Sequence, residues 1–149
     1  MTVDLVVVGD DGSDGARHAL EWAAQSALAL GAELRIVHAV GLLEHAGLGP
    51  AATVDADADA ALALATSAGL GRGRVEWRFE DGDPCTALLR AAEEAREHGS
   101  TVLLVVGSRG AGAHTGTLLG STSLELAEHA EVPVTIVPPP GRAGGRAKR

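Results

Sequence analysis

The stretch Thr101–Gly110 reads TVLLVVGSRG and decides the fold class. Its first six residues are all β-branched or leucine, a pattern that predicts a fully buried strand. The strand runs directly into Gly107-Ser108-Arg109-Gly110, which holds two glycines. A buried strand that ends in a glycine-rich turn is typical of a parallel sheet covered by helices. In such sheets, ligands bind beyond the carboxyl ends of the strands.

Strand and helix patterns alternate along the rest of the chain. The other strand-like stretches are Val3–Val8, Glu33–Val40, Arg74–Glu80 and Val132–Val137. The helical stretches are Asp14–Leu30, a segment that starts within Thr53–Asp59 and ends near Ser67, Pro84–His98 and Ser121–Ala130. Ser13, Asp83 and Ser121 are the predicted N-caps, and 41–50 is a predicted loop. This alternation predicts an α/β fold, with a parallel sheet covered by helices on both faces.

Pro133 lies inside the last predicted strand. Because proline has no N–H to donate, the strand is expected at an edge of the sheet. An apolar edge strand invites a second chain, so we expect a homodimer through Val132–Val137. An edge blunted by Pro133 and by the three prolines that follow is the alternative.

Composition limits the possible functions. A chain of 149 residues fits one domain, expected over 1–138, and the basic residues within 139–149 predict a flexible tail. The net charge of −8 disfavours nucleic acid. No apolar run is long enough for a signal peptide or a membrane span, so we expect a cytoplasmic protein without membrane contact. Cys85 lies near a helix N-terminus, which can lower the pKa of a thiol, but without a partner base an inert role is expected.

The segment from Gly107 to Ser121 is suited to phosphate. Glycine lets a backbone approach a phosphate closely, and here glycines stand at Gly107, Gly110 and Gly120. Ser121 stands where a helix begins, so free N–H groups and the helix dipole can face an anion. Further donors to phosphate are expected from Arg109, Ser121 and Thr122.

At this point the chain resembles the universal stress protein family. That family has the pattern Gly-x2-Gly-x9-Gly-Ser/Thr after its fourth strand, matched by Gly107, Gly110, Gly120 and Ser121. The family's Val-Gly-x-Asp-Gly-Ser segment corresponds to residues 8–13. The resemblance implies that Asp11 and the backbone of Val40 hold the adenine side. We therefore predict an open, doubly wound, Rossmann-like sheet of five parallel strands in the order 3-2-1-4-5.

The resemblance also implies the function. It implies a dimeric, ATP-binding regulatory protein of the stress response, with Mg²⁺ beside the nucleotide. A cyclic nucleotide would use many of the same contacts. Asp10 departs from the family, because a hydrophobic residue is common there. Two adjacent carboxylates, Asp10 and Asp11, would repel phosphates unless Mg²⁺ or the local geometry intervenes.

Two other functions stay open. The first is a slow ATPase or autophosphorylating protein that uses the same site, and the second is a nucleotide-free dimerisation adaptor. The intact glycine pattern argues against the adaptor. Catalysis needs a positioned base, and the sequence pairs no histidine with a serine or cysteine at a known motif spacing, so no catalytic residue is predicted. His114 could approach a phosphate. No zinc-ligand spacing is present, and no protein metal ligand is predicted.

Overall fold

The computed structural model describes residues 2–40, 51–109 and 119–140, without the side chains of 40 and 51–53. In this part of the chain the strands are β1 (Leu5–Gly9), β2 (Glu33–Val40), β3 (Val75–Asp81), β4 (Val102–Gly107) and β5 (Val134–Val137). The helices are α1 (Asp14–Leu30), α3 (Ala51–Ser67), α4 (Pro84–Glu97) and α5 (Ser121–His129). The predicted loop at 41–50, Gly110, His114 and the basic tail from 141 onward lie outside the described residues.

The strands form one parallel sheet in the order β3-β2-β1-β4-β5, which confirms the predicted topology. The chain runs from β1 outward to β3 and then crosses back to β4. The strand order therefore reverses between β1 and β4, which pair through Leu5 and Val102. In open α/β sheets this reversal point is where ligands bind, because the connections leave the sheet on opposite faces there.

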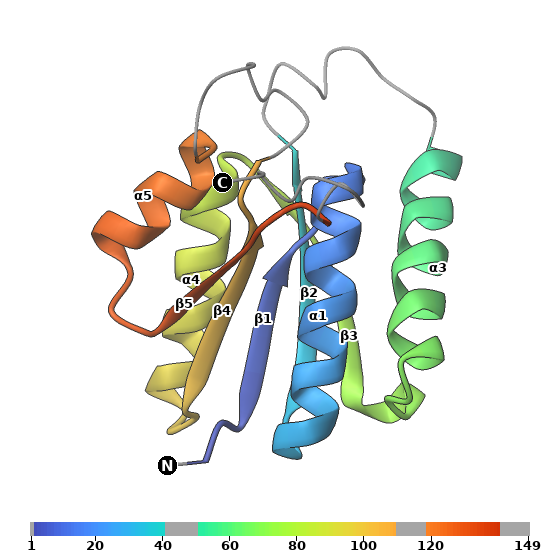
Figure 1. Ribbon diagram of the computed structural model, residues 1–149, viewed down its shortest axis with the longest axis horizontal. Helices are drawn as coiled ribbons and strands as arrows, with labels where there is room; N and C mark the ends of the chain where they lie inside the picture. Colours follow the sequence, from blue (N-terminus) through green and yellow to red (C-terminus); the bar gives the residue numbers. More distant parts are fainter. Residues whose placement is uncertain (1, 41–50, 110–118, 141–149) are drawn as a thin grey trace, which may run out of the picture.

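Helices cover both faces of the sheet, α1 and α3 on one side and α4 and α5 on the other (Figure 1). Alternate residues of β1 supply the two cores. Val6 and Val8 pack with α1 and α3, whereas Leu5 and Val7 pack with α4 and α5. Strand β1 thus lies between two helical layers. Because the sheet is parallel, the carboxyl ends of all its strands point to one edge of the molecule.

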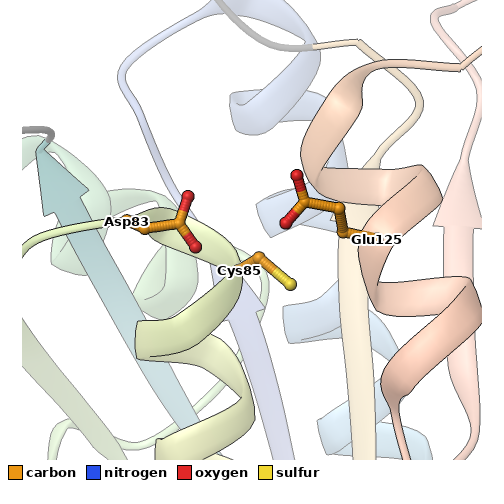
Figure 2. Close-up of side chains that lie close together, drawn as sticks. All are labelled: Asp83, Cys85 and Glu125. Atoms are coloured by element: carbon orange, nitrogen blue, oxygen red, sulfur yellow. The ribbon is translucent and has the colours of Figure 1, made fainter.

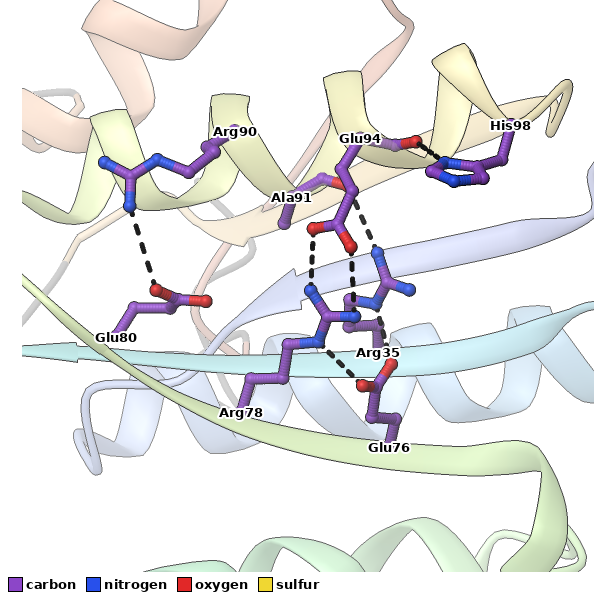
Figure 3. Close-up of polar contacts among 8 residues, drawn as sticks. All are labelled: Arg35, Glu76, Arg78, Glu80, Arg90, Ala91, Glu94 and His98. Carbon is purple, nitrogen blue, oxygen red and sulfur yellow. Dashed lines mark hydrogen bonds and ion pairs between the residues drawn. The ribbon is translucent and has the colours of Figure 1, made fainter.

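Charged side chains of β2 and β3 bind α4 to the sheet (Figure 3). Arg35 on β2 donates through Nε to Glu76 of β3 at 2.8 Å and through Nη1 to the carbonyl of Ala91 at 3.2 Å. Arg78 on β3 pairs with Glu94 of α4 at 2.8 Å. Burial tends to raise the pKa of Glu76, but hydrogen bonds from Arg78 and Arg35 outweigh it and lower that pKa. The edge strand β3 is therefore held by ion pairs as well as by the sheet.

Several boundaries differ from those predicted. Helix α3 starts at Ala51, before the predicted Thr53–Asp59, since helical backbone continues upstream through alanines. Strand β3 starts at Val75 because Arg74 closes a short 3-10 turn by donating its N–H to Gly71.

Pro133 lies just before β5 rather than inside it. Its carbonyl accepts a hydrogen bond from Leu104 of β4 at 2.9 Å. Proline can accept such a bond but cannot donate one, so it marks the start of the strand. Strand β5 is an edge strand, as predicted, and pairs with β4.

Candidate functional site

The end of β4 lies against the start of α1. A Cβ atom added to Gly107 would lie 3.0 Å from the carbonyl oxygen of Gly15. A Cβ atom added to Gly15 would lie 2.9 Å from the carbonyl oxygen of Arg109. Both are backbone contacts, which do not move aside as a flexible side chain would. Only glycine fits the two positions without displacing backbone, and Gly15 is a site residue that the sequence reasoning missed.

The start of α5 is fixed to the same strand end. The amide of Gly120 donates to the carbonyl of Ser108 at 2.6 Å. The hydroxyl of Ser123 donates to the carbonyl of Gly107, also at 2.6 Å, and Ser123 is buried. These two hydrogen bonds hold the start of α5, at Gly120, against the end of β4, at Gly107. Ser123 was also missed, because its spacing alone does not separate it from any other serine on a helix.

The N-cap of α5 is Gly120 and not Ser121, which corrects the prediction. Gly120 has an extended backbone (φ −72°, ψ 164°), and its carbonyl accepts from the amide of Leu124. Ser121 is therefore the first helical residue, and its side chain is exposed. Since glycine has no side-chain oxygen, it cannot satisfy the amides of the first turn as a serine cap would.

The first turn of α5 is consequently rich in donors. Within the described residues, nothing accepts a hydrogen bond from the backbone amides of Ser121 and Thr122. Free amides and the helix dipole make such a turn attractive to an anion. The hydroxyls of the same two residues add donors. Arg109, exposed on the segment that leaves β4, adds a positive charge.

The turn after β1 separates the two adjacent carboxylates. Asp10 is buried, and its Oδ1 accepts from the amide of Gly12 at 3.0 Å and lies 3.6 Å from Nε of Arg17. Asp11 is exposed, and its Oδ1 accepts from the amide of Ser13 at 2.9 Å. Gly12 makes this arrangement possible with a φ of +80°. The turn therefore leaves only the carboxylate of Asp11 exposed, and the buried carboxylate of Asp10 does not face a bound phosphate.

The predicted adenine-side residues lie at the ends of neighbouring strands. Val40 is the last residue of β2 and pairs with Asp81 of β3. Asp11 follows β1, the strand between β2 and β4. The contacts described here join Gly107, Gly120 and the start of α5 into one cluster. Asp11 and Val40 lie at the same edge of the sheet as this cluster.

Cys85 lies beside the cluster but is not a reactive thiol (Figure 2). Its sulfur and carboxylate oxygens of Asp83 and Glu125 all lie within 4.8 Å of one another. Burial, and after it the charges of Glu125 and Asp83, raise the pKa of the thiol to about 11. These effects outweigh any lowering of the thiol pKa by the N-terminus of α4. Cys85 therefore stays protonated and unreactive near neutral pH.

A cavity of about 550 Å³ lies at the opposite end of the sheet, where β1 and β2 begin. Its charged lining consists of Asp4, Glu33, Arg35, Glu94 and His98. Three of these are acids, and Arg35 is already engaged with Glu76 and Ala91. This lining would repel phosphate, so the carboxyl end of the sheet is the better nucleotide site.

The chain belongs to the universal stress protein family, whose model matches residues 3–138. A universal stress protein of Mycobacterium tuberculosis, Rv1996, is 31% identical over 150 residues, covering 89% of this chain and 47% of that protein. One of Mycolicibacterium smegmatis is 42% identical over 66 residues, covering 44% of this chain and 20% of its own length. The chain therefore spans half or less of the length of these curated relatives.

Solved structures agree with this assignment. A universal stress protein in complex with cAMP is 34% identical and has a TM-score of 0.73, covering 92% of this chain and 98% of its own. Protein Rv1636 from Mycobacterium tuberculosis is 35% identical with a TM-score of 0.59, covering 92% and 96%. Separately, a search of the described residues finds no helix long and apolar enough to cross a membrane.

Proposed function

We propose that this chain is an ATP-binding regulatory module of the stress response. The observation that supports this most is the glycine-capped start of α5, held against the end of β4 by the bonds from Gly120 and Ser123. Its free first-turn amides suit a phosphate group. In the proposal, Gly107, Gly110 and Gly120 let the backbone approach the phosphates. Ser121, Thr122 and Arg109 donate to them.

The adenosine end lies toward β1 and β2 in this proposal. Asp11 and the backbone of Val40 contact adenine, and Mg²⁺ accompanies the phosphates. The separation of Asp10 from Asp11 supports this placement, because only Asp11 is exposed at the site edge. A metal ion held mainly by phosphate oxygens and water needs few protein ligands.

The module acts as a cytoplasmic homodimer through Val132–Val137. Strand β5 is a short edge strand whose residues 134–136 are only half-buried. A second copy would cover them and satisfy the outer backbone groups of the strand. The folded module spans 1–138, and 139–149 is a flexible basic extension.

Binding without rapid turnover fits two of the described histidines. His38 is buried beside the rings of Trp77 and Phe79, and Nδ1 of His98 lies 2.7 Å from the carbonyl of Glu94. Both are placed for structure and not as bases for an attacking water. Slow ATP hydrolysis or autophosphorylation at the same site, and a nucleotide-free adaptor, remain the alternatives that the experiment below must separate.

A cyclic nucleotide is the second candidate ligand. A relative that is 34% identical was solved in complex with cAMP, and the alignment covers 92% of this chain. One phosphate on the first turn of α5 would satisfy the same amides. ATP is the first candidate because the glycine pattern extends over a segment of sequence long enough for several phosphates.

Native mass spectrometry of the purified chain tests this function. We expect a dimer with one bound nucleotide per chain, and the mass added shows whether it is ATP or a cyclic nucleotide. A sample incubated with Mg-ATP and remeasured separates retained ATP from ADP. A nucleotide-free chain whose melting temperature does not rise with Mg-ATP or cAMP would contradict the proposal and favour the adaptor.

A further inference from the structure

The part of α3 that lies toward the carboxyl end of the sheet buries no side chain (Figure 1). None of the residues 54–60 is buried, whereas Ala61 and Ala65 further along the helix have no exposed surface. Helix α1, by contrast, buries six side chains between Ala16 and Ala27. We call residues 54–60 the strap. A segment with few buried apolar contacts opens locally at a lower free-energy cost than the core does.

The strap is rich in like charges and has few ties to the rest of the molecule. Asp55 and Asp59 are four residues apart, so they share a helix face and repel each other. Within the described residues, side chains of the strap make one polar contact outside α3. Oδ1 of Asp57 lies 3.9 Å from Nη2 of Arg17 on α1. This ion pair is therefore the polar contact that the strap loses when it opens.

Arg17 is held in place by a second carboxylate. Its Nε lies 3.6 Å from Oδ1 of Asp10, whose side chain has no exposed surface. The other oxygen of Asp10 has no hydrogen-bond partner among the described residues, so the buried charge depends on Arg17. Separating such a pair leaves an uncompensated buried charge, which is costly. Asp57 is 43% exposed, and water can replace its contact. Opening therefore breaks the pair with Asp57 and keeps the pair with Asp10.

One rigid group thus connects the strap to the turn after β1. A guanidinium is planar, so the orientation in which Nε faces Asp10 also decides where Nη2 points. Asp10 is fixed in turn by the amide of Gly12, which donates to its Oδ1 at 3.0 Å. Asp11 lies between these two residues in the same turn. A change in this turn therefore changes how Arg17 meets Asp57.

We propose that residues 54–60 open and close as a strap, and that Arg17 latches the strap to the turn that carries Asp11. The inference rests on the proposed function where it concerns nucleotide, because Asp11 is a proposed nucleotide contact. A nucleotide that orders the turn fixes Arg17 and favours the closed strap. By linkage, the closed strap favours nucleotide binding to the same extent. The strap is then the element through which the bound state changes the surface of the molecule.

Hydrogen exchange read by mass spectrometry tests the latch without any nucleotide. Exchange is followed over the strap and over residues 61–67 in the wild type, in Asp57→Asn and in Asp59→Asn. Asp59 is exposed on the same helix and has no ion pair among the described residues, so its variant controls for the lost charge. We expect Asp57→Asn to exchange about threefold faster over the strap, the effect of one exposed ion pair. Residues 61–67 and the control are expected to exchange no faster than in the wild type.

Arg17→Lys tests the latch from the other side. Lysine keeps the positive charge for Asp10 but has no planar fork with which to reach both carboxylates. We expect its strap to exchange as fast as that of Asp57→Asn. Unchanged exchange of the strap in Asp57→Asn, or equal acceleration in Asp59→Asn, would overturn the inference.

A second series of measurements with saturating Mg-ATP tests the coupling to nucleotide. We expect Mg-ATP to slow exchange of the strap in the wild type by about threefold, and by less in Asp57→Asn. Equal slowing in both, or no slowing in a wild type that binds ATP by calorimetry, would overturn the coupling. A wild type that binds no nucleotide would instead contradict the proposed function, while the measurements without nucleotide still decide whether Arg17 holds the strap.

Discussion

Ser123 and Ser121 stand two residues apart at the start of α5 and have different roles. Ser123 is buried, and its hydroxyl holds the carbonyl of Gly107 at 2.6 Å. Ser121 is exposed on the first turn of the helix. Ser123 therefore holds the start of α5 against β4, and the hydroxyl of Ser121 is available to a ligand.

Replacement of each serine by alanine separates these roles. Ser123→Ala leaves the partly buried carbonyl of Gly107 without this partner, and we expect the free energy of unfolding to fall by about 1 kcal/mol. Ser121→Ala removes only an exposed hydroxyl, so we expect a stability change within about 0.5 kcal/mol and weaker ATP binding. Urea unfolding and calorimetry measure the two effects. Equal loss of stability in both variants would show that the bond from Ser123 is not important.

Candidate site residues that belong to a sequence pattern could be predicted from the sequence. Residues whose role depends on a single contact between distant segments could not. Gly107 and Gly120 could be selected as candidates from the sequence because their spacing matches a pattern that suits phosphate. Gly15 and Ser123 were not found, because each depends on how closely two segments far apart in the chain approach. Asp10 is buried and the adjacent Asp11 is exposed because of the turn geometry, which the identity of these two residues does not determine.

At the scale of elements, boundaries were predicted well where a local signal ends the element. Helix α1 runs from Asp14 to Leu30 as predicted, since Ser13 caps its start and Gly31 ends it with a φ of +69°. The start of α5 was misplaced by one residue. A glycine followed by a serine offers two acceptable caps, and the bond from Gly120 to Ser108 decides between them. Pro133 correctly indicated that β5 is an edge strand, whereas the apolar pattern placed the start of the strand at Val132, two residues before its observed start at Val134.

The ion pairs that fasten β3 to α4 predict an acid-sensitive contact. The pKa of Glu76 is lowered in the folded chain from its usual 4.5. The folded state therefore binds this proton less readily than the unfolded chain does. The ionised carboxylate of Glu76 therefore stabilises the folded state at pH values above the pKa that it has in the unfolded chain. This stabilisation is lost as the pH falls through the lower pKa that Glu76 has in the folded chain.

Glu76→Gln should reduce the pH dependence of stability between about pH 5 and about pH 3. Because Glu76 is partly exposed, we expect a difference below about 1 kcal/mol. Urea unfolding across that range measures it. Glu97→Gln, exposed on α4 and without an ion pair among the described residues, is the control. A Glu76 variant that loses stability in acid as steeply as the wild type would contradict the account.

At the scale of the whole molecule, the two ends of the sheet differ in chemistry. The amino end holds an acidic cavity whose arginine is already hydrogen-bonded. Within the described residues, the carboxyl end holds the unpaired first-turn amides of α5 beside Gly107 and Gly120. The class of fold and the strand order followed from the alternation of patterns and the family resemblance.

The most direct test of the central claim is calorimetric titration of Mg-ATP into the wild type, Gly120→Val and Gly73→Val. Gly73 lies in the 3-10 turn, and a Cβ atom there would meet nothing within 4 Å, so its variant controls for the added side chain. We expect the wild type and Gly73→Val to bind equally. We expect Gly120→Val to lose at least about tenfold in affinity, because its side chain occupies the space of a phosphate. Unchanged affinity in a folded Gly120→Val would show that the phosphates bind elsewhere.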